Sequence, residues 1–564
     1  MLTPWGEKLD RSSVLPEYPR PQMVRESYIN LNGAWEYAVT QSDAVPDKWD
    51  GEILVPFSPE CQLSGTGCQV GPKDWLWYRR SFTLPEGFNK ARVLLHFGAV
   101  DQTATVYLNG KELKTHVGGY LPFTVELTSV ISEENTLVVR VKDETDEDWH
   151  TRGKQKRRRG GIWYTPQSGI WQTVWLESVP DAYIKRLVIT PIYDSGTVEI
   201  GAEVVGKIRP VAHFQGEDYP LPARIPVPDF EAWSPECPKL YDFSVTCGDD
   251  SVSSYFAMRK FSVEPDESGV KRLFLNGRPY FHNGLLDQGY WSDGLYTAPS
   301  DEAMIYDIRT AKEMGFNMLR KHIKVEPLRW YYHCDVLGML VWQDMPCGGG
   351  VYSPAIVSTP LMTGKHIKDS AYMLFGRGEK GGRDEFEQEL RGMVTELYNC
   401  PCIAMWVPFN EGWGQFDSQR LCDVIRGIDD TRTIDHASGW HDQKIGDIQS
   451  LHVYFKKYAY KPDKLGRAVI LSEFGGYSHR VSGHCLSEKE FGYKKFESPL
   501  LLESALQELY SEQIRPAAAE GLSAAVYTQL SDVEDELNGL VTYDRRLVKI
   551  PIQKLKSIVK VGND

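Results

Sequence analysis

The stretch Met405–Asp417, MWVPFNEGWGQFD, contains the pattern that decides the fold of this chain. It extends an apolar run that begins at Ile403 and has the length of one buried parallel strand. Pro408 ends that strand, because proline has no N–H to donate to a sheet. Asn410 and Glu411 follow directly. We therefore expect Glu411 at the carboxyl end of a strand, where α/β enzymes hold their catalytic groups.

A second stretch repeats this pattern. Ala468–Leu471 is a short apolar run, and Ser472, Glu473, Phe474 and two glycines follow it. Two carboxylates on separate strand ends can face each other across one pocket. One acid that protonates a leaving oxygen and one carboxylate that attacks or stabilises a sugar carbon are the minimum for cleaving a glycosidic bond. For either glutamate alone, an acid placed to suit a helix dipole is an equally good interpretation.

The composition is that of a soluble protein of several domains. The chain has 564 residues, 41% apolar and 25% charged, so we expect three or four domains. A net charge of −14 argues against a nucleic-acid partner. Neither a signal peptide nor an apolar run long enough to span a membrane is present, which argues against a membrane partner. Ten scattered cysteines favour reduced thiols and a cytoplasmic location.

Strand and helix patterns divide the chain into three parts. Residues 1–180 contain short strands separated by turn signals, which are typical of a β-sandwich, and residues 181–262 indicate a smaller immunoglobulin-like sandwich. From residue 263 to residue 564 strands alternate with helices, and eight such units predict a closed (β/α)8 barrel. The basic run Lys154–Arg159 is interpreted as a solvated loop. The long irregular segment 347–380 is expected to be functional.

Several motifs together resemble one family, glycoside hydrolase family 2, which contains β-galactosidases, β-glucuronidases and β-mannosidases. The motifs are LNGAW at Leu31, SGIW at Ser168, WSPECPKLY at Trp233, GFNMLR at Gly315, VWQD at Val341, NEGW at Asn410 and SEFGG at Ser472. The resemblance covers nearly the whole chain. It implies a jelly-roll, sugar-binding-like domain over residues 1–180, then the immunoglobulin-like domain, then a catalytic TIM barrel over residues 263–564.

The resemblance also implies roles for the two carboxylates. Glu411 matches the acid/base and Glu473 the nucleophile of a retaining exo-β-glycosidase. A retaining pair stands about 5–5.5 Å apart. We expect the second carboxylate to raise the pKa of Glu411, so that it holds a proton near neutral pH.

Other residues match positions around the family's substrate. Asn410 matches a residue that binds the 2-hydroxyl of the sugar, with a turn residue as the alternative. Tyr454 resembles a tyrosine that donates a hydrogen bond to the nucleophile, and Arg320 matches an arginine near it. For the rest, core packing or a buried histidine with a backbone partner is the alternative. The further candidates for substrate contact are His322, Lys324, His452, Trp440, Gln343 and Asp344.

The sugar is predicted less sharply than the reaction. Family glucuronidases grip the uronate carboxylate with an Asn-x-Lys pair, and here that segment is acidic, with Asp532, Glu534, Asp535 and Glu536. We therefore expect a neutral sugar, a β-galactoside by default, with Lys324 or His322 as the cation that would reverse the preference. The alternatives are a β-mannoside, a β-xyloside, an arabinoside or, less favoured, a β-glucuronide. A catalytically silent carbohydrate-binding protein is the alternative of another class, and a homo-oligomer remains open.

No cofactor is expected. The large metal-dependent galactosidases of the family bind Mg²⁺ with polar ligands where this chain has Met345 and Pro346, so we predict no required metal. Dialysis against EDTA should leave the rate of glycoside hydrolysis unchanged. A large loss that Mg²⁺ restores would contradict this prediction.

Overall fold

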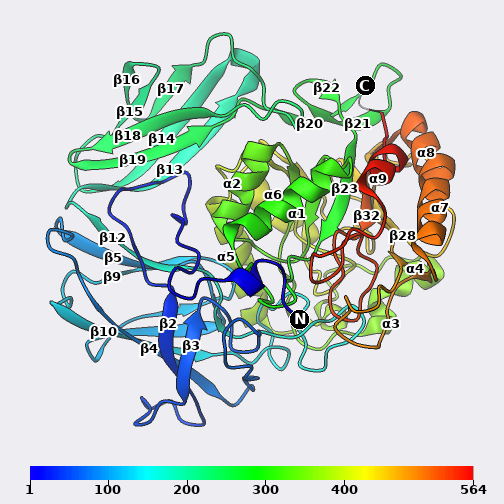
Figure 1. Cartoon of the computed structure of the whole chain (residues 1–564). Coiled ribbons are helices and arrows are strands. Elements are labelled where there is room, and N and C mark those ends of the chain that lie inside the picture. Colours follow the sequence, from blue (N-terminus) through cyan, green and yellow to red (C-terminus); the bar gives the residue numbers. More distant parts are fainter. Residues whose placement is uncertain (563–564) are drawn as a thin grey trace.

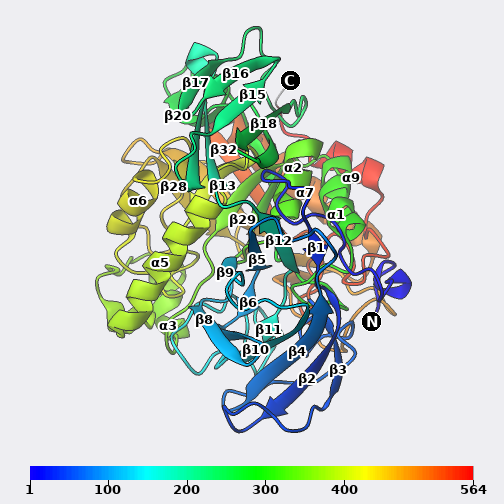
Figure 2. The same ribbon diagram turned by 90° about the vertical axis from the view of Figure 1, so that its left-hand side faces the viewer.

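Two β-sandwiches and a parallel β-barrel follow one another along the chain (Figure 1). The computed structural model describes residues 1–562. Figures 1 and 2 show both sandwiches beside the barrel, the first at one end of the molecule and the second at the other. No helix in this range is long and apolar enough to cross a membrane.

The first sandwich packs a six-stranded sheet, in the order β3-β2-β4-β10-β7-β8, against a four-stranded sheet, in the order β1-β12-β5-β9. Alternation of buried and exposed side chains along β10 shows why it forms a half-buried strand. Asn109 and Gly110 join β7 to β8 with positive φ angles of 53° and 79°, as expected for an Asn-Gly hairpin. The strands are β1 (Ile29–Asn30), β2 (Gly33–Thr40), β3 (Gly51–Val55), β4 (Trp75–Thr83), β5 (Arg92–Phe97), β6 (Val100–Asp101), β7 (Thr103–Leu108), β8 (Lys111–Val117), β9 (Phe123–Glu126), β10 (Glu134–Lys142), β11 (Gly169–Ile170) and β12 (Val174–Val179).

The second sandwich has seven strands in two sheets, ordered β13-β14-β17 and β16-β15-β18-β19. They enclose a separate apolar core that includes Phe214, Phe243 and Phe256. The strands are β13 (Tyr183–Ile192), β14 (Thr197–Val205), β15 (Val211–Phe214), β16 (Glu217–Pro220), β17 (Ala223–Pro226), β18 (Tyr241–Cys247) and β19 (Asp250–Phe256).

A small antiparallel sheet leads into the barrel. It consists of β20 (Phe261–Pro265), β21 (Lys271–Leu275) and β22 (Arg278–Pro279). The predicted domain division between residues 262 and 263 falls inside β20, so the structural boundary lies a few residues earlier, between β19 and β20. Alternation alone could not show which domain a strand at the junction would pair with.

The barrel is an eight-stranded parallel sheet in the order β27-β26-β25-β24-β23-β32-β29-β28. Strand β26 (Ile403–Val407) reads as a continuous apolar run because both of its faces are covered. The barrel strands are β23 (His282–Asp287), β24 (Met318–Lys321), β25 (Leu340–Asp344), β26 (Ile403–Val407), β27 (Thr433–Ile434), β28 (Ile448–Val453), β29 (Ala468–Gly475) and β32 (Leu522–Thr528), with a separate pair β30 (Tyr477–Ser478) and β31 (Lys494–Lys495).

The helices confirm most, but not all, of the predicted alternation. Helices α1 (Asp301–Glu313), α2 (Leu328–Leu337) and α5 (Lys380–Glu396) each lie between two successive barrel strands, as the alternation predicted. Among the described residues no helix joins β27 to β28 or β28 to β29, so the expectation of eight strand–helix units is wrong for two connections. The other helices are η1 (Gly6–Lys8), η2 (Tyr193–Ser195), α3 (Pro354–Val357), α4 (Thr359–Thr363), η3 (Tyr372–Phe375), α6 (Ser418–Arg426), α7 (Pro499–Leu509), η4 (Tyr510–Ile514), α8 (Arg515–Glu520) and α9 (Ile552–Ile558).

Arg25 joins the two sandwiches through buried ion pairs. Its guanidinium binds Asp250 of the second sandwich with two hydrogen bonds of 2.9 Å, and Glu177 of the first at 3.4 Å. All three side chains are almost completely buried. Removing the arginine would therefore leave buried carboxylates short of a counter-charge.

We predict that Arg25→Met lowers stability by about 3–5 kcal/mol, because a buried charge that loses its partner is costly. Thermal unfolding followed by circular dichroism should show a clearly lower midpoint. The control is Arg79→Met, which removes a half-exposed pair with Glu36 and should cost less than about 1 kcal/mol. Equal effects of the two variants would contradict the prediction.

Candidate active site

Glu411 follows β26 in a strained but well-held backbone position. Its φ angle is 52°, a region that residues other than glycine seldom occupy. The Glu411 N–H donates to the carbonyl of Ser438 at 2.9 Å, and the Ser438 N–H donates to that of Phe409 at 2.9 Å. The segments after β26 and β27 therefore hold each other and aim the carboxylate. Strain of this kind is concentrated at functional sites.

Glu473 lies inside β29, which runs to Gly475 and is longer than the apolar run had predicted. Glu411 and Glu473 each place a carboxylate oxygen within 4.8 Å of the other and of a ring nitrogen of His452. The two glutamates thus stand together at the carboxyl ends of their strands. Both are at least nine-tenths buried.

Arg320, at the end of β24, connects the two carboxylate-bearing segments. Its guanidinium donates to Glu473 Oε1 at 3.1 Å and to the carbonyl of Ser472 at 3.1 Å. It also donates to Asn410 Oδ1 at 2.9 Å and to both oxygens of Asp344 at 3.0 Å. Because arginine is only a donor, it fixes which way the Asn410 amide points. The Asn410 NH₂ group is then turned away from Arg320 and has no other hydrogen bond within residues 1–562.

Arg320 and Asp344 therefore hold other groups of the site in position, and the expectation that both bind substrate stays a prediction. Arg320 is fully buried and Asp344 is almost so. The second oxygen of Asp344 also accepts from His322 Nδ1 at 2.7 Å. Since a carboxylate accepts, His322 carries its proton on Nδ1 and presents Nε2 as an acceptor. Burial, with the charges of Lys154 and Arg320, keeps the pKa of His322 well below its ordinary value.

His452 stands between the catalytic candidates. Its Nδ1 lies 2.7 Å from Glu411 Oε1, and its Nε2 lies 3.6 Å from Glu473 Oε1 and 3.1 Å from Ser438 Oγ. Burial raises the pKa of Glu411, but the hydrogen bond and charge of His452 outweigh it, so the pKa is lowered. The expectation of a raised pKa is therefore wrong for this state of the site, because a histidine intervenes between the carboxylates.

Aromatic side chains complete the surroundings of the pair. Tyr454 donates to Glu473 Oε2, and its ring stacks on Tyr493 with centroids 3.8 Å apart. Trp413 Nε1 donates to Glu411 Oε2 at 3.2 Å. The ring of the half-buried Trp440 lies 6.2 Å from that of His452. Tyr493 was missed in the sequence because it lies outside the strand ends.

Residues 269–504 match the TIM barrel domain of glycosyl hydrolases family 2, and residues 58–170 match the galactose-binding domain-like part of glycosyl hydrolase 2. The chain belongs to glycoside hydrolase family 2. It is 23% identical over 517 residues to a putative beta-glucuronidase of Formosa agariphila, covering 81% of this chain and 55% of the relative. It is 25% identical over 390 residues to a beta-galactosidase of Thermoanaerobacter pseudethanolicus, covering 63% and 47%. The chain thus spans about half the length of the curated relatives it matches.

Solved structures of similar size share the fold. A beta-glucuronidase of an uncultured Clostridium sp. aligns with a TM-score of 0.74 at 18% identity, over 95% of this chain and 99% of that one. A family 2 beta-galacturonidase of Eisenbergiella tayi bound to galacturonate aligns with a TM-score of 0.73 at 19% identity, over 97% and 100%.

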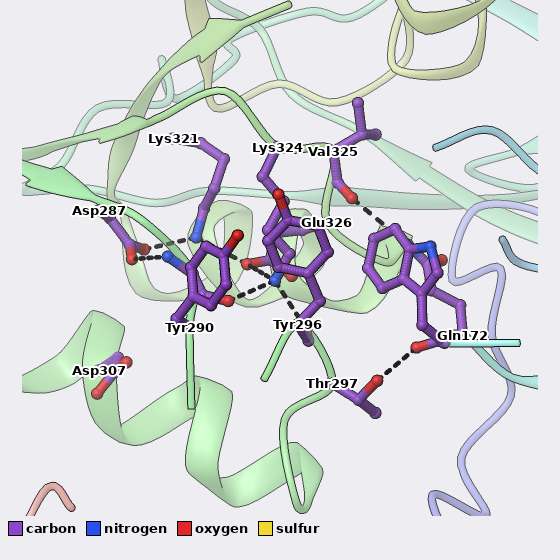
Figure 3. A network of polar contacts seen from close by, with 12 residues as sticks. Gln172, Asp287, Tyr290, Tyr296, Thr297, Asp307, Lys321, Lys324, Val325 and Glu326 are labelled. Carbon is purple, nitrogen blue, oxygen red and sulfur yellow. Dashed lines mark hydrogen bonds and ion pairs between the residues drawn. The ribbon is translucent and has the colours of Figure 1, made fainter. Parts of the chain in front are cut away.

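Lys324 does not belong to the site of this family 2 chain, which corrects the prediction that it contacts substrate. Its ammonium is fully buried and donates to the carbonyls of Gly289 and Tyr296 and to Glu326, at 2.7–2.8 Å, so its three donors are used. Burial lowers the pKa of Lys324 to about 8, although Glu326 opposes this shift. Figure 3 shows it in a network with Lys321 and Asp287. Gln343 lies beside it, donating to the Lys324 carbonyl at 2.8 Å.

The basic run of the first domain reaches the site, contrary to the expectation of a solvated loop. Lys154 and Gln155 are buried, whereas Arg157, Arg158 and Arg159 are exposed. In the same loop Trp163 contacts Trp413, with ring centroids 5.2 Å apart. No sequence signal marked Lys154, because it comes from a loop far along the chain from the barrel.

The acidic segment 532–536 is also less repulsive than its sequence suggested. Asp532 pairs with Lys549 at 2.7 Å, and Arg159 lies 3.4 Å from Glu534 and 3.1 Å from Asp535. Two cations thus pair with these three acids and offset part of their charge. The fourth, Glu536, is buried. Burial raises its pKa, although the charge of Lys154 opposes this shift.

Within residues 1–562, two groups of side chains could hold a metal ion, Glu411 with His452 and Glu473, and the more exposed Glu144 with Asp148 and His150. The first contains both candidate catalytic carboxylates, so a metal bound there would block them. Met345 lies buried at the end of β25 and offers only a weak thioether ligand.

We predict that His452→Asn moves the alkaline limb of the kcat/KM profile to higher pH. The limb reports loss of the proton from Glu411, and removing the partner that lowers its pKa raises that pKa. The profile should be measured with an aryl glycoside that the wild type hydrolyses. His213→Asn, in the second sandwich, is the control and should leave the profile unchanged. A limb that stays in place or moves to lower pH would contradict the assignment.

Proposed function

We propose that this chain is a retaining exo-β-glycosidase that releases a terminal sugar by double displacement. The observation that carries the proposal is the pair of buried carboxylates within 4.8 Å at two strand ends. This separation suits a retaining pair, since an inverting pair is set farther apart to admit a water.

The partners of each carboxylate support the division of roles. Glu473 accepts from Arg320 and Tyr454, two donors that favour its ionised form and aim it as the nucleophile. Glu411 is held by His452 and Trp413 and would exchange the proton. In the first step Glu473 bonds to the anomeric carbon while Glu411 protonates the leaving oxygen. In the second, Glu411 takes a proton from a water molecule that attacks the anomeric carbon and displaces the Glu473 carboxylate.

Groups around the pair have matching tasks in this proposal. The Asn410 NH₂, oriented by Arg320, would donate to a hydroxyl beside the anomeric carbon. A cluster of Trp163, Tyr352, Trp413 and Trp440 would stack on the sugar or the leaving group. Tyr352 comes from the irregular segment 347–380, in keeping with the functional role expected for it.

The sequence favours a β-galactoside among neutral sugars, and the relatives include proteins named beta-galactosidase and beta-glucuronidase. A silent carbohydrate-binding protein is less well supported, because binding alone does not require two carboxylates aimed at each other. A panel of 4-nitrophenyl β-galactoside, β-glucoside, β-mannoside, β-xyloside, β-glucuronide and β-galacturonide, with an α-arabinoside, separates these alternatives.

We predict that Glu411→Gln and Glu473→Gln each lower kcat by at least about 10³-fold with the fold intact. Azide should restore turnover of Glu473→Gly and give an α-glycosyl azide, because the anion can occupy the place of the missing nucleophile. Proton NMR of the product checks the anomer, and circular dichroism checks the fold. Activity of either Gln variant within tenfold of wild type would refute the roles.

A further inference from the structure

Lys154 is carried into the barrel site by a loop of the first domain that is fastened on both sides. The N–H groups of Arg152 and Gly153 donate to the carbonyl of Cys347 at 2.9 Å and 3.0 Å. On the other side, the Tyr164 N–H donates to the Lys154 carbonyl at 2.9 Å. The Gln155 side chain donates to Asp101 and to the hydroxyl of Tyr120, both at 3.2 Å. These contacts fix where the lysine side chain starts.

Lys154 is a buried residue, and its ammonium has no counter-charge in bonding contact. The residue is only 8% exposed. Its Nζ lies 5.7 Å from the ring centroid of Tyr164, and within residues 1–562 it makes no hydrogen bond or ion pair. A buried ammonium in this condition is costly unless something supplies the missing interactions. By contrast, Lys321, Lys324 and Lys549 are buried in ion pairs.

Lys154 lies near Glu411 and Glu536. Its positive charge acts on the pKa of Glu411, of His322 and of Glu536. Glu536 accepts a hydrogen bond from the hydroxyl of Tyr164, the same residue whose ring lies against Lys154. The Lys154 ammonium and the Glu536 carboxylate therefore both lie beside Tyr164, but they make no ion pair with each other.

We propose that Lys154 is a specificity-determining residue that binds an oxyanion, foremost the carboxylate of a β-linked uronic acid. A neutral hydroxyl supplies an acceptor but no charge, whereas a carboxylate supplies both. A second cation of the site, the guanidinium of Arg320, is already engaged by Asp344, Asn410 and Glu473. The ion pairs of Lys549 and Arg159 reduce the repulsion between segment 532–536 and such a ligand. The inference rests on the proposed glycosidase activity and names the substrate class for it.

The test compares wild type with Lys154→Met and Lys154→Arg on matched substrates. The 4-nitrophenyl β-glucuronide and β-galacturonide should be preferred over the β-glucoside and β-galactoside by about 100-fold or more in kcat/KM. Lys154→Met should lose about 100-fold on the uronides and less than about fivefold on the neutral sugars. Lys154→Arg should keep most of the uronide activity. Arg158→Met, an exposed position in the same loop, is the control for loss of one positive charge.

A 6-sulfated β-galactoside distinguishes the source of the oxyanion, since preference for it over both uronides assigns Lys154 to a sulfate ester. Equal loss on charged and neutral substrates, or a wild type that prefers the neutral sugars, overturns the inference while leaving the glycosidase proposal standing. Calorimetric binding of glucaro-1,4-lactone gives a readout free of turnover. Binding that depends on Lys154, without hydrolysis of any substrate, would support the oxyanion site and refute the proposed activity. No binding and no hydrolysis would overturn both.

Discussion

The arrangement of this site depends on one buried guanidinium. Arg320 reaches from the end of β24 to Asp344 on β25, to Asn410 after β26 and to Glu473 on β29, so it touches most of the strand ends that carry the chemistry. Burying an arginine is costly unless its donors are satisfied, and here they are all directed at fixed acceptors. Strands that are distant in the barrel order are thereby held in one geometry. Arg320 thus fixes Glu473 directly and Glu411 through its neighbour Asn410.

The pKa of Glu411 depends on burial and on His452, which lies between the two carboxylates. Burial and mutual repulsion favour a protonated acid, but His452 offers Glu411 a hydrogen bond and a charge. The histidine is itself placed by β28 and by Ser438. The protonation of the acid/base candidate is thus controlled by a third residue, which a ligand that enters between the carboxylates would displace or reorient.

The first domain is part of the site and not only a neighbour of the barrel. Its connecting loop supplies Lys154 and Trp163, and Gln172 meets the barrel at Val325, beside the lysine network shown in Figure 3. The loop that carries Lys154 is bonded to Cys347 of the barrel domain, so the position of Lys154 depends on how the two domains pack together. The barrel alone would lack Lys154 and Trp163, which gives a physical reason for the first domain to be packed against it.

Local pattern determined much of this protein. Apolar runs ending in Pro408 and in Gly475–Gly476 placed both glutamates at strand ends, and alternation distinguished the sandwiches from the barrel. These features depend on near neighbours in the chain, so the sequence contains them. The sequence could not show that Lys324 is held by Glu326 and backbone carbonyls, that Asp344 binds Arg320, or that Lys154 and Gln155 are buried at the start of a basic run. Those outcomes depend on which segments meet across hundreds of residues, and only the packed structure brings a lysine at 154 to carboxylates at 411 and 536.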